Sequence, residues 1–177
     1  MKSPLAMMTA ALALIGCSAT PVPVEPVQNF NAEDYLGTWY EIARLDHSFE
    51  RGLSNVTANY SYRDDGKIRV INRGYNDEKG KYEEAEGKAK FAEDEETGAL
   101  RVSFFGPFYG DYIIFGLDQS EDGYSFVSGG TEEYLWLLSR TPVVSDSVKD
   151  EFLAQAAALG YDTDALIWVD QSMAAEG

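Results

Sequence analysis

The chain has 177 residues, enough for one domain with a buried core, and its 13% of aromatic residues and 16 glycines favour a β-rich fold with tight turns. A formal net charge of −16 argues against a nucleic-acid partner, because phosphates would be repelled. With Cys17 as the single cysteine and His47 as the single histidine, a disulfide within the chain and a Cys/His metal site are excluded, and we predict no metal or cofactor.

The first residues are typical of an export signal. Lys2 precedes an apolar stretch from Leu5 to Ile15, which is shorter than the about 20 residues of a membrane-spanning helix. Leu14-Ile15-Gly16-Cys17 then resembles a bacterial lipobox, in which the chain is cut before an acylated cysteine. We predict a lipoprotein signal peptide over residues 1–16 and a lipid anchor of diacylglycerol and palmitate type on Cys17. The alternative is an ordinary signal peptide with an incidental cysteine.

The segment after Cys17 predicts where the protein is sorted and how it is tethered. Ser18 is not the Asp that retains lipoproteins in the inner membrane, which implies a lipid-anchored protein of the outer membrane, facing the periplasm. Residues 17–28 contain Pro21, Pro23 and Pro26, so they cannot form a helix. We expect an extended spacer that reaches roughly 30 Å at about 3.1 Å per residue.

Turn signals recur at short intervals beyond residue 37 and divide the chain into segments with strand character. Short connections predict an antiparallel meander, and eight such strands can close and remove their exposed edges. We therefore predict an all-β, eight-stranded up-and-down barrel over residues 29–171, with a tail at 172–177. The expected strands lie at about 38–45, 55–63, 67–75, 81–91, 99–105, 111–117, 124–129 and 134–140.

Alternation identifies the inward face of the fourth strand. Ala85, Gly87 and Ala89 alternate with charged residues, which places these small residues inside and predicts open space there. The alternative is that bulky side chains opposite fill the interior.

A helix should follow the eighth strand. Ser145 is a suitable N-cap and Gly160 a suitable stop, and an apolar face predicts that this C-terminal helix packs outside the barrel. A short last strand is expected from Leu166 to Val169. The apolar face consists of Val148, Phe152, Ala156 and Leu159.

Two motifs carry a resemblance to the lipocalins. Gly37-Thr38-Trp39 resembles the family's G-x-W at the start of the first strand, and Leu138-Ser139-Arg140 its motif at the end of the eighth. The resemblance implies that Arg140 packs over Trp39 and closes the barrel floor. Asp118 matches a further motif, from which Leu117 and Gln119 depart.

Longer segments, from Tyr35 to Arg44 and from Val102 to Tyr109, are similar to the bacterial outer-membrane lipoprotein lipocalins of the Blc type, relatives of apolipoprotein D. This resemblance implies a protein that is not an enzyme, binds fatty acids or lysophospholipids, and serves envelope maintenance under stress. The same resemblance is compatible with a homodimer.

The loops after strands one, three, five and seven share one end, which holds the longest loop and an aromatic cluster, so we predict the mouth there and an acidic, closed base opposite. An acyl chain would enter at the mouth and leave its head group near the rim. The expected ligand contacts are Phe104, Tyr109, Trp136 and Leu138, the small residues Ala85, Gly87 and Ala89, and the basic residues Arg44 and Arg73. Alternatively, Trp136 is ordinary filling, and Arg44, His47, Arg51 and Arg73 are solvated surface groups.

Two other functions stay open. One is a lipocalin-fold enzyme acting on lipids, although Asp46, His47 and Ser48 are adjacent along the chain, where side chains diverge, and so do not form a triad. The other is a structural or partner-binding envelope protein with a filled barrel, which a structure without an internal cavity would favour.

Overall fold

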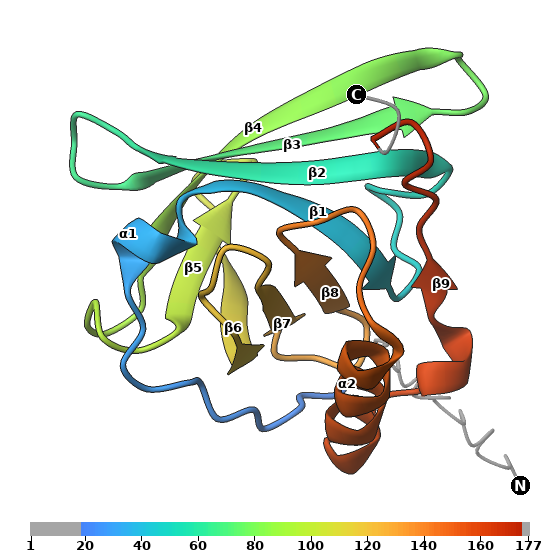
Figure 1. Ribbon diagram of the computed structural model, residues 1–177. Coiled ribbons are helices and arrows are strands. Elements are labelled where there is room, and N and C mark those ends of the chain that lie inside the picture. Colours follow the sequence, from blue (N-terminus) through green and yellow to red (C-terminus); the bar gives the residue numbers. More distant parts are fainter. Residues whose placement is uncertain (1–18, 175–177) are drawn as a thin grey trace, which may run out of the picture.

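The computed structural model describes residues 19–174, in which a strongly curved antiparallel sheet closes on itself beside one long helix (Figure 1). Every predicted barrel strand is present, with ends within two residues of those expected. The elements are α1 (Ala32–Tyr35), β1 (Gly37–Arg44), β2 (Leu53–Tyr62), β3 (Ile68–Asn76), β4 (Lys81–Phe91), β5 (Ala99–Ser103), β6 (Gly110–Leu117), β7 (Tyr124–Ser128), β8 (Leu135–Ser139), α2 (Asp146–Ala158), the 3-10 helix η1 (Thr163–Ala165) and β9 (Ile167–Trp168).

The sheet is closed by β1, which pairs with both β2 and β8. Tyr40 of β1 lies opposite Thr57 of β2 on one side and Ser139 of β8 on the other. The remaining strands pair in chain order and antiparallel, and β9 adds to the end of β1. The predicted fold class, an eight-stranded up-and-down barrel with a C-terminal helix outside, is therefore confirmed.

The closed end of the barrel is built around Trp39, which is fully buried. Its indole Nε1 donates to the carbonyl of Tyr35 at 2.8 Å, and the guanidinium carbon of Arg140 lies 3.8 Å from its ring centroid. Arg140 also donates to the carbonyl oxygens of Leu36 and Thr38. This is the contact that the family resemblance implies, and it ties the ends of β1 and β8 together.

The short helix α1, which the sequence analysis did not predict, covers this closed end (Figure 1). Asn31 is its N-cap and accepts from the amide of Glu33 at 3.0 Å. A single helical turn leaves almost no periodicity in the sequence, which is why the pattern could not reveal it.

A second apolar core lies outside the barrel, beneath α2. Phe152 and Ala156 of α2 are fully buried, and the Phe152 ring packs 5.2 Å from that of Phe126 on β7. Ser145 caps the helix by accepting from the amide of Val148, and the chain turns away at Gly160, whose φ is +92°. The predicted helix, its cap and its buried face are confirmed.

The proline-rich segment departs from the prediction of a free spacer. It is extended, but it lies along the barrel wall: the amide of Val22 donates to the carbonyl of Gly130 at 2.9 Å, and that of Val27 to Ile114 at 2.8 Å. Val22 is buried. Val22 and Val24 alternate with the exposed residues Pro21, Pro23 and Glu25 and pack on the outer core, while Val27 packs on the barrel core.

The predicted signal peptide and Cys17 lie outside the described residues. Within residues 19–174, no helix is long and apolar enough to cross a membrane.

Candidate ligand-binding site

A cavity occupies the half of the barrel that is farther from α1, and it opens between the loops that were predicted to form the mouth. It has two chambers, an inner one of about 330 Å³ and an outer one of about 500 Å³. Both are within the size range of small-molecule sites. The two chambers are adjacent, since the following residues line both: Phe49, Glu50, Val56, Asn72, Val102, Phe104 and Gly110.

Tyr60 and Tyr112 form the floor of the inner chamber, and Tyr35 lies directly behind them. The Tyr112 hydroxyl lies 2.7 Å from that of Tyr35 and 2.9 Å from that of Tyr60. Burial raises the pKa of Tyr35 to about 12, and it raises the pKa of Tyr60 and Tyr112 well above 10.0. The floor is therefore polar but neutral, and its hydroxyl groups bond mainly to one another. The sequence analysis did not identify these residues, although Tyr60 shares the inward face of β2 with Ala58.

The small residues of β4 do not open the interior as predicted. Gly87 and Ala89 are buried, but a Cβ atom at Gly87 would lie only 2.8 Å from the Phe104 ring, so that ring occupies the space the glycine leaves. Only Ala85 lines the cavity, at the outer chamber, where it is exposed. The expectation of empty space beside Gly87 is wrong because Phe104, the residue directly after β5, packs against it, and Ala89 is buried in the barrel core.

The other predicted apolar contacts do line the cavity. Trp136 and Leu138 face the inner chamber, and Phe104 faces both chambers. Tyr109 lies at the outer chamber with the Lys90 Nζ 4.9 Å from its ring centroid. Their contact with a ligand stays a prediction.

Arg44 is neither a solvated surface group nor a cation that could bind a head group at the mouth, because its side chain is buried. The Arg44 side chain is buried in the barrel wall, where it donates to Glu41 Oε1 at 2.6 Å and to the carbonyl of Glu50 at 2.9 Å. Glu50 in turn accepts from Trp136 Nε1 at 3.1 Å, and its carboxylate lies 2.9 Å from His47 Nε2. We call Glu41, Arg44, His47 and Glu50 the buried ionic cluster.

A β-bulge explains how Arg44 comes to lie beside Glu41. The pairing of β1 with β8 shifts register between Glu41 and Ala43. Ile42 and Ala43 both pack into the outer core, so Arg44 returns to the side of Glu41. The inward position of Glu41 itself could have been read from the sequence, because it is two residues after Trp39.

The ionic cluster makes one wall of the inner chamber rich in carboxylates. Burial raises the pKa of Glu41 well above 4.5, the nearby Glu50 raises it further, and Arg44 opposes both. Glu41 and Glu50 line the inner chamber, and Arg44 is already bonded behind them. The depth of the cavity therefore disfavours an anionic head group.

The remaining predicted cations lie at the rim. Arg73 lines the outer chamber and is half exposed. Its guanidinium carbon lies 3.7 Å from the Tyr82 ring centroid, and its Nε lies 3.8 Å from Glu84 Oε1. Arg51 is exposed and paired with Asp46 at 2.7 Å. Of the predicted basic residues, Arg73 is the one that remains accessible to a ligand in the outer chamber.

The neighbours Asp46, His47 and Ser48 do not converge. His47 is buried against Glu50 and stacks on Phe49, with ring centroids 3.9 Å apart, whereas Ser48 is exposed. Among residues 19–174, no group of three or more His, Cys, Asp or Glu side chains is arranged to hold a metal ion.

Comparison with known proteins places the chain in a family. The lipocalin-like domain family matches residues 30–171. The outer membrane lipoprotein Blc of Vibrio cholerae is 54% identical over 165 residues, which cover 93% of this chain and 96% of that protein. The protein of the same name from Escherichia coli K12 is 53% identical over 169 residues, covering 94% and 95%. Rat apolipoprotein D is 36% identical over 129 residues, covering 68% and 66%.

The solved structure of insecticyanin from Manduca sexta superposes with a TM-score of 0.70 at 24% identity, covering 89% of this chain and 90% of that one, and shows the same fold. The names of the bacterial relatives agree with the predicted outer-membrane location. The chain belongs to the lipocalin family, among the outer-membrane lipoprotein lipocalins of the Blc type.

Proposed function

We propose that this protein binds lipids with one acyl chain, fatty acids or lysophospholipids, and stores or carries them for maintenance of the cell envelope under stress. The observation that carries the proposal is the cavity: its lining is mostly apolar, it opens at one end, and tyrosines close the other. Burying about 14 CH₂ groups at about 0.8 kcal/mol each offers roughly 11 kcal/mol before the costs of association.

The geometry favours one orientation of the ligand. The methyl end enters the inner chamber toward Tyr112, because that chamber is mostly apolar and the Glu50 carboxylate in its wall would repel an anion. The carboxylate or phosphate stays in the outer chamber, where Arg73 lies within reach.

The anchor belongs to the same proposal. Acyl chains on Cys17 would hold the barrel at the outer membrane, since two or more chains give stable attachment. The bacterial relatives named as lipoproteins support this assignment.

A binding role is favoured over catalysis because the histidine and serine weighed as catalytic groups line neither chamber. His47 is engaged with Glu50 and Phe49, and Ser48 is exposed away from them. One chain lines the whole cavity, so binding does not require the homodimer that the resemblance offered.

Binding of a fluorescent fatty acid tests the proposal, with Ala58→Phe as the variant that fills the inner chamber. Ala58 lines that chamber, whereas Ala154 is exposed on α2 and Ala154→Phe serves as the matched control. We expect Ala58→Phe to weaken binding by at least about tenfold, as overpacking leaves no room for the chain, and the control to bind like the parent. A parent protein that binds no lipid of any class would contradict the proposal.

A further inference from the structure

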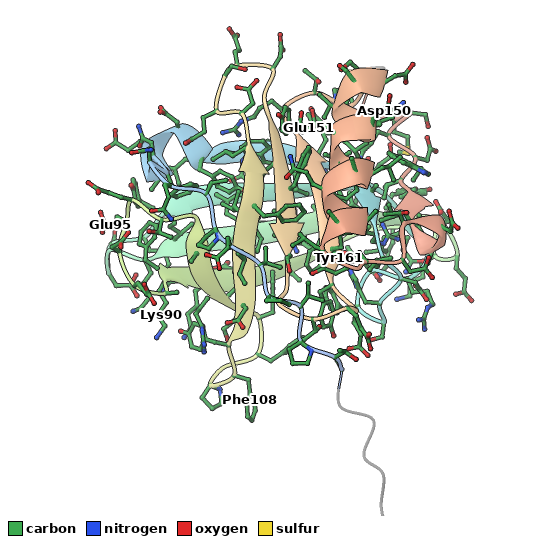
Figure 2. The ribbon with its side chains drawn as sticks, turned by 90° about the horizontal axis from the view of Figure 1, so that it is seen from below. Lys90, Glu95, Phe108, Asp150, Glu151 and Tyr161 are labelled. Atoms are coloured by element: carbon green, nitrogen blue, oxygen red, sulfur yellow. The ribbon has the colours of Figure 1, made fainter. Side chains whose placement is uncertain are left out.

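Two large apolar side chains project from the mouth end of the barrel into solvent. Phe105 and Phe108, in the loop between β5 and β6, are 80% and 79% exposed. The amide of Phe108 donates to the carbonyl of Phe105 at 3.2 Å, so a tight turn presents both rings together. Figure 2 shows Phe108 at the tip of a loop that extends beyond the strands. Exposed apolar clusters of this kind mark interaction surfaces.

The N-terminal segment starts at the same end of the barrel. The Thr20 amide donates to Glu132 Oε1 at 3.3 Å, and the Glu132 amide donates to the Thr20 carbonyl at 3.0 Å. Pro21 forms a β-bridge with Thr131, which lines the inner chamber. In Figure 2 this segment begins on the side of the molecule where Phe108 lies.

The position of Thr20 limits where an anchor on Cys17 can be. Three residue-to-residue steps lead from Thr20 to Cys17, and each spans at most about 3.6 Å, so the chain length keeps an anchor on Cys17 within about 11 Å of Thr20. The spacer that would have let the barrel turn freely is instead bonded along the wall, through Val22 and Val27. An anchor at this point holds the mouth end, rather than the closed end, next to the bilayer.

We propose that the mouth end docks on a phospholipid bilayer, with Phe105 and Phe108 in the interface, so that the cavity opens toward the lipid surface. The proposal rests on the proposed function for the acyl anchor. Tethering makes a weak apolar contact sufficient, because the local concentration of bilayer is high.

The charge of the rim specifies the kind of bilayer. Charges of both signs surround the mouth: Glu83, Glu84 and Asp111 pair with Lys79, Arg73 and Arg101, and Lys88 and Lys90 lie beside Tyr109. The rim therefore offers no excess of positive charge to anionic lipids. We therefore assign a surface of zwitterionic phospholipids. The rim carboxylates are Glu83, Glu84, Asp111, Glu132 and Glu133.

Quenching by brominated lipid tests the orientation directly. The chain from Cys17 onward, which contains every described residue, is coupled through its only thiol to maleimide lipid in brominated phosphatidylcholine vesicles. Phe108→Trp places a reporter at the mouth and Glu121→Trp places one in the exposed loop after β6 at the closed end. The emission added by each reporter over the parent protein is measured with and without bromine.

We expect the reporter at position 108 to be quenched at least about twofold more strongly than the one at 121, and the difference to shrink when anionic phosphatidylglycerol replaces much of the phosphatidylcholine. Equal quenching, or stronger quenching at 121, would overturn the docking proposal.

Lipid transfer supplies a second readout. Phe105→Ser with Phe108→Ser should slow uptake of a fluorescent fatty acid from the vesicles by roughly fivefold or more, after correction for the affinity of the same variant in solution. The matched control is Tyr62→Ser with Val143→Ser, which removes side chains that are 51% and 72% exposed at the closed end. An equal effect of both pairs would contradict the proposal.

These experiments separate the two proposals. If the parent binds no fatty acid in solution, the proposed function fails, while quenching still reports the docking. If the untethered protein is a dimer that the double phenylalanine variant converts to a monomer, and position 108 shows no quenching, the patch joins two copies of this chain and the docking proposal is wrong.

Discussion

The two ends of this barrel are made from the same strands but are packed in opposite ways. At the closed end, α1, Trp39 and Arg140 leave no space, and the buried tyrosine hydroxyls bond mainly to one another. At the mouth, the strands enclose a cavity and the loops expose aromatic rings. The comparison teaches that a barrel can concentrate its stabilising contacts at one end and keep the other end open for binding.

The two interior tryptophans give the largest test of this division. Trp39→Ala should lower the free energy of unfolding by about 3–5 kcal/mol, because it leaves a large void under Arg140. Trp136→Ala should cost less, because Trp136 faces the cavity, and should weaken fatty-acid binding more. Urea unfolding and fluorescence titration of both variants check this. Equal losses of stability in the two variants would contradict the claim that the closed end carries most of the stabilising contacts.

The buried ionic cluster gives the next largest effect. Arg44→Met removes the cation from the buried Glu41–Glu50 carboxyl pair and leaves the negative charge of that pair without a partner, which should cost about 3 kcal/mol or more at pH 7. Arg51→Met, at an exposed pair, should change stability little. Urea unfolding of the two variants measures the difference, and similar losses would show that burial of the first pair is unimportant.

The same cluster predicts a pH dependence with a definite sign. Since burial and Glu50 hold the pKa of Glu41 well above 4.5, the folded state keeps a proton that the unfolded state releases. This contribution to stability is complete below pH 4.5 and is lost as pH rises through the folded pKa. Glu41→Gln should therefore flatten the fall of stability with rising pH. The free energy of unfolding of both proteins is measured from pH 4.5 upward. If it falls equally with pH in the parent and in Glu41→Gln, the prediction is wrong.

The smallest effect is expected at the rim. Arg73→Gln should weaken binding of a fatty acid by roughly threefold to fivefold and leave binding of the uncharged methyl ester unchanged, because an exposed cation stabilises an anion only modestly. Arg51→Gln is the control, since Arg51 is paired with Asp46. A loss of equal size for acid and ester would show that Arg73 does not meet the head group.

Much of the fold could be predicted because period-two alternation and turn residues are local signals. The motif residues Trp39 and Arg140 also indicate the closed end from the sequence alone. The mouth was assigned correctly, since alternate hairpin loops of a meander must share one end.

The site was harder to predict because its details depend on contacts between strands. The bulge after Glu41 turns Arg44 inward, and Phe104 fills the space beside Gly87 from a neighbouring strand. The docking of Val22 on the barrel depends on where β7 ends, far away in the sequence. Neither the bulge nor the packing of Phe104 has a periodic signature in the residues that make it.

The central claim is that an acyl chain enters at the mouth and ends near the tyrosine floor. A crystal structure with a fatty acid that carries bromine at its methyl end locates that end by anomalous scattering. We expect the bromine in the inner chamber, close to Tyr60 and Tyr112, with the carboxylate in the outer chamber near Arg73. Bromine at the rim, or on the outside of the barrel, would contradict the account.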